Sequence, residues 1–459
     1  MKQTSEWMAL VLILFMACSP GKENKSPDAT PGSLSEAAMP EWAADATIYE
    51  VNIRQYTPEG TFAAFQEHLP RLKELGVEIL WFMPIHPISE EGRKGTLGSY
   101  YAVRDYLAVN PEFGTLQDFK DLVDACHEAG FKVLLDWVAN HTGRDHVWID
   151  EHPEWFTRDS LGTLLSPVPD WSDVADLNYE QPGMQDAMID ALKYWVRESD
   201  IDGYRCDVAG MVPVAFWEEA RRALDSIKPV FMLAEDEGEK ALLNKAFNMN
   251  YGWHFHHVMN QLARGEAGPE EVKAYVSRVD STYPIGSFPM QFTSNHDENS
   301  WNGTEFERLG DAAKTMAALS FVVPGMPLIY TGQEAGNLFR LEFFEKDEVD
   351  WSRPEMQRFY ASLIDLKQEN PALWNGTAGG PVHFLKTKEG SSLLAFTREK
   401  ENNRVLTLFN LSPDPVHEVV NCPEIAGTYT DALSGEKMPF EKETEVELDG
   451  WGYRIWVQP

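Results

Sequence analysis

Apolar and polar positions alternate in blocks along most of the 459-residue chain. Short, continuously apolar runs are typical of strands that are buried on both faces of a parallel sheet. We expect such strands at residues 46–53, 78–85, 131–138, 201–208, 229–235, 246–250, 289–294 and 327–331. Between them lie segments with apolar residues at helical spacing, at 65–75, 184–198 and 214–227, and a helix that opens at Thr115 and ends at Gly130.

Strands that alternate with helices in this way predict a parallel sheet, and eight of them predict a closed (β/α)8 TIM barrel of the α/β class. An open, doubly wound sheet would show the same alternation, but no glycine-rich phosphate-binding loop follows the first strand. We place the barrel at residues 41–375. An irregular insertion rich in Asp, Pro and Trp follows the third strand, at about residues 141–179. Loops of this length in a compact domain are usually functional.

The pattern changes after about Pro371. Strand-like runs separated by turn residues follow one another at short spacing, as in "VHFLKTKEGSSLLAFTRE" and "RVLTLFNLSPDPVHEVV". Such spacing is typical of antiparallel sheets. It predicts a C-terminal β-sandwich domain at residues 376–459.

The N-terminus has the features of a targeting segment. The apolar run at residues 8–17 is too short to cross a bilayer as a helix but fits the core of a signal peptide. The alanine before Cys18 makes this site resemble a bacterial lipobox, whose cysteine is lipidated and becomes the mature N-terminus. We therefore expect a signal peptide at 1–18, a lipid on Cys18 and a flexible linker at 19–40. An ordinary cleaved secretory signal is the alternative, and both interpretations predict an exported protein.

The net charge of the chain limits the kinds of molecule that it is expected to bind. The chain has 39 Lys and Arg against 73 Asp and Glu, a formal net charge of −34. Nucleic acid is excluded as a partner because its binding requires cations that displace counterions from phosphates. Binding to an anionic membrane through a basic patch is excluded for a similar reason, which leaves the N-terminal lipid as the only expected membrane contact. A neutral substrate such as a sugar meets no such repulsion.

The remaining cysteines, Cys126, Cys206 and Cys422, show neither a disulfide framework nor a metal-binding spacing. We expect them to be buried thiols.

Polar residues gather where the predicted barrel strands end, which is where barrel enzymes place their reactive groups. Taken singly, a carboxylate there usually caps a helix or pairs with a surface cation, and a histidine usually packs. Arg205 and Asp207 share one face of their strand because side chains alternate, so Cys206 should face the helices. The strand ends carry Asp136, Asn140, His141, Arg205, Asp207, Glu235, His296 and Asp297. Independent helix caps do not explain so many acidic and basic groups in one layer of the barrel.

The segments "DWVANH", "GYRCD", "LAE" and "SNHDE" resemble, in order and spacing, the four strand-end motifs of glycoside hydrolase family 13, the α-amylase family. "ADLNYE" in the long loop and "GQE" after the eighth strand are similar to further family segments. "SYYAVRDYLAVNPEFGT" resembles the segment whose tyrosine, here Tyr101, stacks beneath the cleaved sugar. The resemblance runs from about Trp42 to the C-terminus, since the family commonly adds a β-sandwich.

This resemblance implies a retaining glycosidase, in which one carboxyl attacks the sugar and a second acts as acid and base. It makes Asp207 the nucleophile, Glu235 the general acid/base and Asp297 a third carboxylate that binds sugar hydroxyls. Arg205 would keep Asp207 ionised. His141 and His296 would donate hydrogen bonds to the sugar, and Tyr101 would form an aromatic platform.

Some positions depart from the family pattern. Members acting on starch often carry Lys and His where this chain has Gly210 and Met211, which affects binding of the leaving-group sugars. Asn140 matches a calcium ligand of the family, but its usual histidine partner falls at Met211. No cofactor is required by this chemistry, and a structural calcium stays open.

Three tryptophans, Trp171, Trp253 and Trp301, lie in loops expected near the rim. They could stack on further sugar rings, but packing of the loops onto the barrel is the more common use of large aromatic residues.

We therefore predict an enzyme that cleaves α-glucosidic bonds, with α-1,4 links of starch or maltooligosaccharides as substrate. An exo-acting α-glucosidase or an α-glucanotransferase would use the same residues. A non-catalytic glycan-binding protein on the same fold is the alternative from another class. The sequence does not indicate an oligomeric state.

Overall fold

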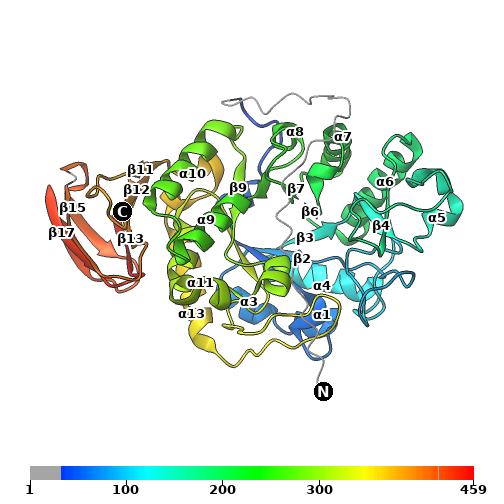
Figure 1. The fold of residues 1–459 in the computed structure, drawn as a ribbon, viewed down its shortest axis with the longest axis horizontal. Coiled ribbons are helices and arrows are strands. Elements are labelled where there is room, and N and C mark those ends of the chain that lie inside the picture. The colour runs from blue at the N-terminus through cyan, green and yellow to red at the C-terminus, as the bar shows by residue number, and fades with distance from the viewer. Residues whose placement is uncertain (1–32, 422, 459) are drawn as a thin grey trace, which may run out of the picture.

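The computed structural model describes residues 33–421 and 423–458, and its centre is a closed parallel barrel (Figure 1). The strands lie around the barrel in the order β1-β10-β9-β8-β7-β6-β3-β2. This closure confirms the predicted (β/α)8 barrel and rules out an open, doubly wound sheet. The barrel strands are β1 (Ile48–Val51), β2 (Ile79–Phe82), β3 (Lys132–Trp137), β6 (Gly203–Cys206), β7 (Phe231–Ala234), β8 (Met249–Tyr251), β9 (Phe288–Gln291) and β10 (Met326–Tyr330).

Two predicted elements differ from the observed ones. The first strand is shorter than residues 46–53, because Ile53 already opens the short helix α1 (Ile53–Tyr56). The helix expected at 65–75 is divided into α2 (Phe62–Gln66) and α3 (Leu69–Leu75). Pro70 lies in the first turn of α3, where the missing backbone N–H has no intrahelical partner to lose. The proline therefore favours a new helix start at this point.

Helices surround the barrel and bury their apolar faces against it. The longer ones are α4 (Leu116–Glu128), α6 (Pro182–Ser199), α7 (Val214–Asp225), α9 (Trp253–Ala263), α10 (Pro269–Thr282), α12 (Ala313–Val322) and α13 (Pro354–Glu369). Thr115 begins α4 with a capping box, in which its hydroxyl accepts the Asp118 N–H while the Asp118 carboxylate accepts the Thr115 N–H. Cys206 packs in this interlayer core, as the alternation along its strand predicted.

The insertion after β3 contains the antiparallel pair β4 (His141–Gly143) and β5 (Val174–Asp176) and the helix α5 (Trp148–Glu151). It forms the lobe at the right of the barrel in Figure 1. The pairing of His141 with Asp176 returns the insertion to the C-terminal end of the barrel strand from which it started. The insertion therefore covers the face of the barrel that carries the predicted site.

The C-terminal part forms a β-sandwich (Figure 1, left). One sheet has the order β11-β12-β13-β18-β15-β16 and the other pairs β14 with β17. An apolar core that includes Leu406 and Val446 fills the space between the two sheets. The strands are β11 (Val382–Phe384), β12 (Leu393–Lys400), β13 (Asn403–Asn410), β14 (Val416–Asn421), β15 (Gly427–Asp431), β16 (Lys437–Phe440), β17 (Glu443–Leu448) and β18 (Tyr453–Gln458). The buried Arg398 of β12 donates to the carbonyls of Val322 and Val323 and so fastens this domain to the barrel.

The chain from Ser33 to Pro40 is fastened to the barrel, although residues 19–40 were predicted to be a flexible linker. Ser35 N–H donates to the Ile285 carbonyl at 2.9 Å, and the Asn248 side-chain amide donates to the carbonyls of Ala37 and Ala38. Ile285 and Asn248 directly precede barrel strands, so this segment lies on the N-terminal face of the barrel. The linker prediction is therefore wrong for residues 33–40, and the rest of it lies outside the described residues.

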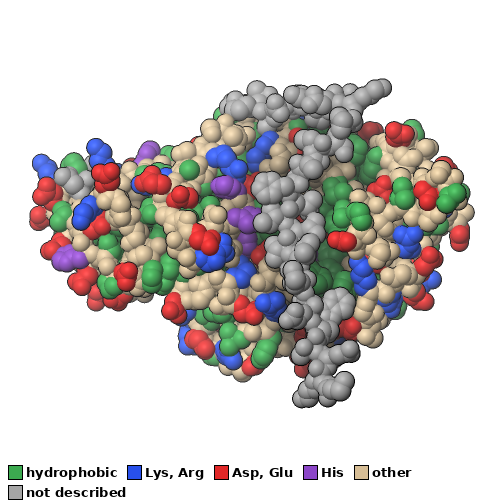
Figure 2. Space-filling model, viewed as in Figure 1, with side chains coloured by type: hydrophobic (Ala, Val, Ile, Leu, Met, Phe, Trp, Pro, Cys, Tyr) green, Lys and Arg blue, Asp and Glu red, His purple; other side chains and the backbone are tan. Residues whose placement is uncertain are grey.

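Several other predictions can be placed. Cys126 and Cys206 are free, buried thiols, as expected, whereas Cys422 and the proposed lipid site Cys18 lie outside the described residues. Within residues 33–421 and 423–458, no helix is long and apolar enough to cross a membrane. Acidic side chains are spread over the visible face of the molecule and do not form one patch (Figure 2).

Candidate active site

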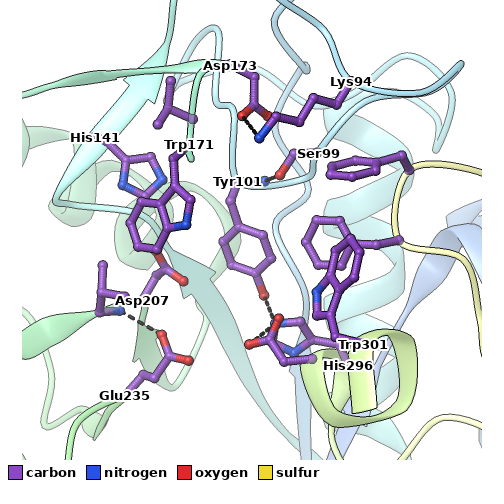
Figure 3. Close-up of a pocket in the computed structure, with 15 residues that line it drawn as sticks. Lys94, Ser99, Tyr101, His141, Trp171, Asp173, Asp207, Glu235, His296 and Trp301 are labelled. Carbon is purple, nitrogen blue, oxygen red and sulfur yellow. Dashed lines mark hydrogen bonds and ion pairs between the residues drawn. The ribbon is translucent and has the colours of Figure 1, made fainter. Parts of the chain in front are cut away.

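A pocket of about 390 Å³ opens at the C-terminal ends of the barrel strands (Figure 3). Six of the seven predicted active-site residues line it, namely Tyr101, His141, Asp207, Glu235, His296 and Asp297. The seventh, Arg205, is fully buried beneath them. Residues predicted from five separate segments of sequence therefore converge on one solvent-accessible space.

Arg205 is the cation around which the acidic groups gather. Its Nη1 donates to Asp136 Oδ1 at 2.8 Å and to Asp207 Oδ1 at 3.1 Å, and its Nε donates to the Tyr251 hydroxyl. Its Nη2 lies 2.9 Å from Glu235 Oε2, an ionic contact in which the N–H does not point at the oxygen. Because a planar guanidinium offers donors in fixed directions, this residue sets the relative positions of Asp207 and Glu235.

Asp136, at the end of β3, supports the site from below. It is fully buried, and its second oxygen accepts hydrogen bonds from Trp81 Nε1 and from the Tyr101 hydroxyl, both at 3.1 Å. Its carboxylate thus joins Arg205 to the aromatic floor of the pocket. Tyr101 itself lies nearly parallel to the His296 ring, with ring centres 5.3 Å apart.

His296 is held from both sides by carboxylates. Its Nδ1 contacts Glu50, a fully buried residue of β1, and its Nε2 lies 2.8 Å from the Tyr101 hydroxyl and 3.5 Å from Asp297 Oδ2. Burial by itself would lower the pKa of His296, but the charges of Asp297 and Glu50 outweigh it and raise this pKa to about 9. Burial raises the pKa of Glu50. We take His296 as the proton carrier of the pair because it faces two carboxylates.

Carboxyl groups outnumber cations in this network. Arg205 and His296 are the two cations, and they contact five carboxyl groups, those of Glu50, Asp136, Asp207, Glu235 and Asp297. Burial and the neighbouring Glu235 raise the pKa of Asp207 against the opposing effect of Arg205. Burial raises the pKa of Glu235 too, again opposed by Arg205 and aided by Asp297. Such an excess of buried acid favours a carboxyl group that keeps its proton near neutral pH.

The backbone after Asp207 is strained. Val208 has φ +37° and ψ +46°, a left-handed conformation that is unfavourable for a β-branched residue. In this conformation its N–H donates to Glu235 Oε2 at 2.8 Å. The strained turn therefore connects the end of β6 to the carboxyl group that follows β7.

Aromatic side chains and His141 complete the walls. Burial lowers the pKa of His141 to about 3, so its ring is neutral, and its Nδ1 contacts the Asn140 amide. Trp171 packs near His141, and Trp301, which is 53% exposed, packs against Phe343. Both tryptophans line the pocket.

Trp253 does not line the pocket among the residues described. It packs against Tyr251 and Phe292, as the alternative prediction of loop or core packing proposed.

Sequence reasoning missed several residues of the site. Glu50 was overlooked, although a single carboxylate within the apolar run "IYEV" is itself a signal. The other missed residues come from loops without a recognisable pattern, namely Lys94, Ser99, Asp173, Val208, Phe343 and Phe344. Nothing in the local sequence shows that these residues meet.

The described side chains give no support for a structural calcium, which stays a prediction. Calcium takes about six to eight oxygen ligands, several of them carboxylates. In the part of the chain that the structure covers, no three His, Cys, Asp or Glu side chains converge in a way that could hold a metal ion. The amide of Asn140, the residue that resembles a family calcium ligand, contacts His141 instead.

Comparison with known protein families shows to which family this chain belongs. The model of the alpha-amylase catalytic domain matches residues 28–160 and 169–389, and that of the maltogenic amylase C-terminal domain matches residues 382–455. The chain belongs to the α-amylase family. Membership of this family confirms the predicted class of enzyme, a glycoside hydrolase.

Relatives in the family share both domains with this chain. An α-amylase from Lactobacillus plantarum is 32% identical, with a TM-score of 0.82 over 91% of this chain and 100% of its own. A maltogenic α-amylase from Thermotoga neapolitana is 29% identical, with the same TM-score over 90% and 98%. The α-amylase of Haloarcula japonica is 28% identical over 86% of this chain, which spans only 59% of that protein.

Proposed function

We propose that this protein hydrolyses α-1,4-glucosidic bonds of starch or maltooligosaccharides with retention of configuration. The observation that supports it is the meeting of Asp207 and Glu235, from two different strands, on the single buried guanidinium of Arg205 at the base of an open pocket. Retaining glycosidases need two carboxyl groups on either side of one bond. Relatives named maltogenic α-amylase, cyclomaltodextrinase and neopullulanase support the substrate class.

Each residue has a proposed role. Asp207 attacks the anomeric carbon, and Glu235 first protonates the leaving oxygen and then removes a proton from water. Asp297, 37% exposed and next to His296, binds sugar hydroxyls. His141 is neutral and has no partner for Nε2 among the described residues, so this nitrogen can bond a hydroxyl.

The role of His296 is revised. Both of its ring nitrogens contact protein groups, which makes it a support for Asp297 and Tyr101 more than a donor to the sugar. Tyr101 lines the pocket, and its ring would form the platform beneath the sugar that the resemblance implies.

A substrate panel tests the proposal. We expect hydrolysis of starch and maltoheptaose, little action on isomaltose, and products that initially carry the α configuration, measured by chromatography and by proton NMR of the anomeric signal. No cofactor is needed, so chelated, metal-free buffer should support the same activity. Products longer than maltoheptaose would favour an α-glucanotransferase. Binding of maltoheptaose without any cleavage would favour the non-catalytic alternative.

Replacing Glu50 with glutamine should lower the pH at which His296 loses its proton. The charge of Glu50 helps raise the pKa of His296 to about 9, so its loss should lower this pKa by about one unit. In an NMR titration the His296 ring should then lose its proton at lower pH, whereas the alkaline fall in kcat/KM, which follows loss of the proton from the general acid Glu235, should change less. Protonated His296 also stabilises the fold fully below its unfolded pKa of about 6.5, and this contribution is lost as pH rises through about 9. An unchanged titration midpoint of His296 would show that Glu50 does not hold the proton on this ring.

We also propose that the protein is an exported lipoprotein anchored through Cys18. The described chain begins on the N-terminal face of the barrel, opposite the pocket, so an anchor there would leave the site accessible to polymer. Fractionation of cells that express wild type and Cys18→Ser tests this, since only the wild type should sediment with membranes.

A further inference from the structure

We propose that residues 94–97 close one end of the pocket, so that the enzyme acts on the non-reducing ends of chains and releases short products. This inference rests on the proposed function and adds the direction and mode of attack. It concerns the loop between β2 and α4, whose Lys94 and Ser99 line the pocket.

The first fastening joins this loop to the insertion. Lys94 Nζ lies 3.0 Å from Asp173 Oδ1 and donates to the Asp170 carbonyl at 2.7 Å. Asp173 is nearly buried, with 6% of its side chain exposed, so the ion pair is a fixed part of the wall. An ammonium group has three N–H donors, and these two contacts leave one for a ligand.

The second fastening joins the loop to the segment after β10. Thr96 N–H donates to Glu345 Oε1 at 2.7 Å, and Leu97 N–H donates to the Phe344 carbonyl at 3.0 Å. Gly95 has φ +60°, and a Cβ atom there would lie 2.5 Å from Phe344 Cβ. Residues 94–97 thus form a continuous strap, tied at both ends and pressed against Phe344.

The strap lies at the end of the pocket remote from the reacting groups. Figure 3 shows Lys94 and Asp173 on one side of Tyr101, with Asp207 and Glu235 on the other. The anomeric carbon of the cleaved sugar must lie between Asp207 and Glu235. In a pyranose ring C4 is opposite C1, so a sugar that lies along Tyr101 would direct its 4-oxygen toward the strap. In an α-1,4 chain that oxygen carries the next sugar toward the non-reducing end.

The chain shortly after the nucleophile Asp207 is exposed to solvent. Gly210 and Met211, which follow the strained turn at Val208, are exposed, and 47% of Met211 is accessible. A long leaving-group chain can extend over them into solvent. A closed end beyond the sugar and an open end beyond the leaving group together favour exo attack from the non-reducing end.

A substrate with a blocked end tests the strap. The probe is p-nitrophenyl maltoheptaoside with an ethylidene group across the 4- and 6-hydroxyls of its terminal non-reducing glucose, compared with the unblocked compound. The wild type should cleave the blocked substrate at least about tenfold more slowly, because the ethylidene group collides with the strap. In Lys94→Ala and Asp173→Asn the ratio of the cleavage rates of the unblocked and blocked substrates should fall severalfold toward one. The hydrolysis products of maltoheptaose should then be longer than those of the wild type, though still shorter than maltoheptaose.

Lys120→Ala is the matched control. It removes a lysine of similar exposure that pairs with Glu198 at 2.9 Å on the helical layer, and it should leave the ratio unchanged. Thermal melts identify variants that fail to fold. If only one of Lys94→Ala and Asp173→Asn folds, that variant is enough for the test. Equal cleavage of both substrates by the wild type would overturn the exo assignment. If the wild type discriminates against the blocked substrate but both variants discriminate equally strongly, the role of the strap is overturned. Absence of cleavage of either substrate would instead reject the proposed function.

Discussion

Replacing Asp207 with asparagine should lower kcat on maltoheptaose by about 10⁴-fold or more, since loss of a nucleophile removes the covalent step. Asparagine keeps the size of the side chain and can still face Arg205, so the fold and oligosaccharide binding should change little. Burial and the neighbouring Glu235 raise the pKa of Asp207, so its charge costs the folded state stability, and the neutral asparagine should leave the melting temperature unchanged or raise it. The measurement combines steady-state kinetics with calorimetric binding of maltoheptaose.

Asp150→Asn, an exposed residue of α5, is the control for this substitution and should have full activity. Binding of maltoheptaose by Asp207→Asn with no turnover would support the nucleophile assignment. Full activity in Asp207→Asn would remove Asp207 from that role, and the proposed mechanism with it.

Replacing Glu235 with glutamine should lower kcat on maltoheptaose by about 10²–10⁴-fold, the usual contribution of general acid catalysis. The loss should depend on the leaving group, which distinguishes Glu235 from Asp207. With α-glucosyl fluoride, whose fluoride leaves without a proton, formation of the covalent intermediate should be nearly normal. Added azide should then speed turnover by attacking the intermediate without needing a base.

Asp207→Asn serves as the comparison for that experiment, because a fluoride leaving group does not replace a missing nucleophile. Azide that attacks the sugar directly in its place would give a product of inverted configuration. If Glu235→Gln is equally slow with both substrates and azide has no effect, Glu235 is not the general acid. If azide rescues Asp207→Asn through a retained product, the two roles are exchanged.

Periodicity was enough to predict the order of the barrel strands and the helices α4, α6 and α7. These features are local, because each depends on residues close together in the chain. They include the apolar runs at the barrel strands, the change to short strands after Pro371 and the helix cap at Thr115. The errors were local too, since the break between α2 and α3 depends on Pro70 in a pattern that otherwise reads as one helix.

Only some residues of the candidate site could be predicted from the sequence. Asp207, Glu235 and Asp297 could be found because parallel strands deliver their C-terminal ends to one face. Glu50 was not found, because its partner His296 is 246 positions away. Val208 was missed because strain at a single residue leaves no trace in composition.

The sequence alone thus determined the closed barrel, the added sandwich and the principal acidic residues, because these follow from spacing along the chain and from the geometry of parallel strands. Only the tertiary structure decided which group holds His296, how one guanidinium, that of Arg205, contacts three carboxylates, and that residues 94–97 bridge two loops. Such contacts join residues far apart in the chain through loops without periodicity, and they form only when the whole barrel brings these loops together.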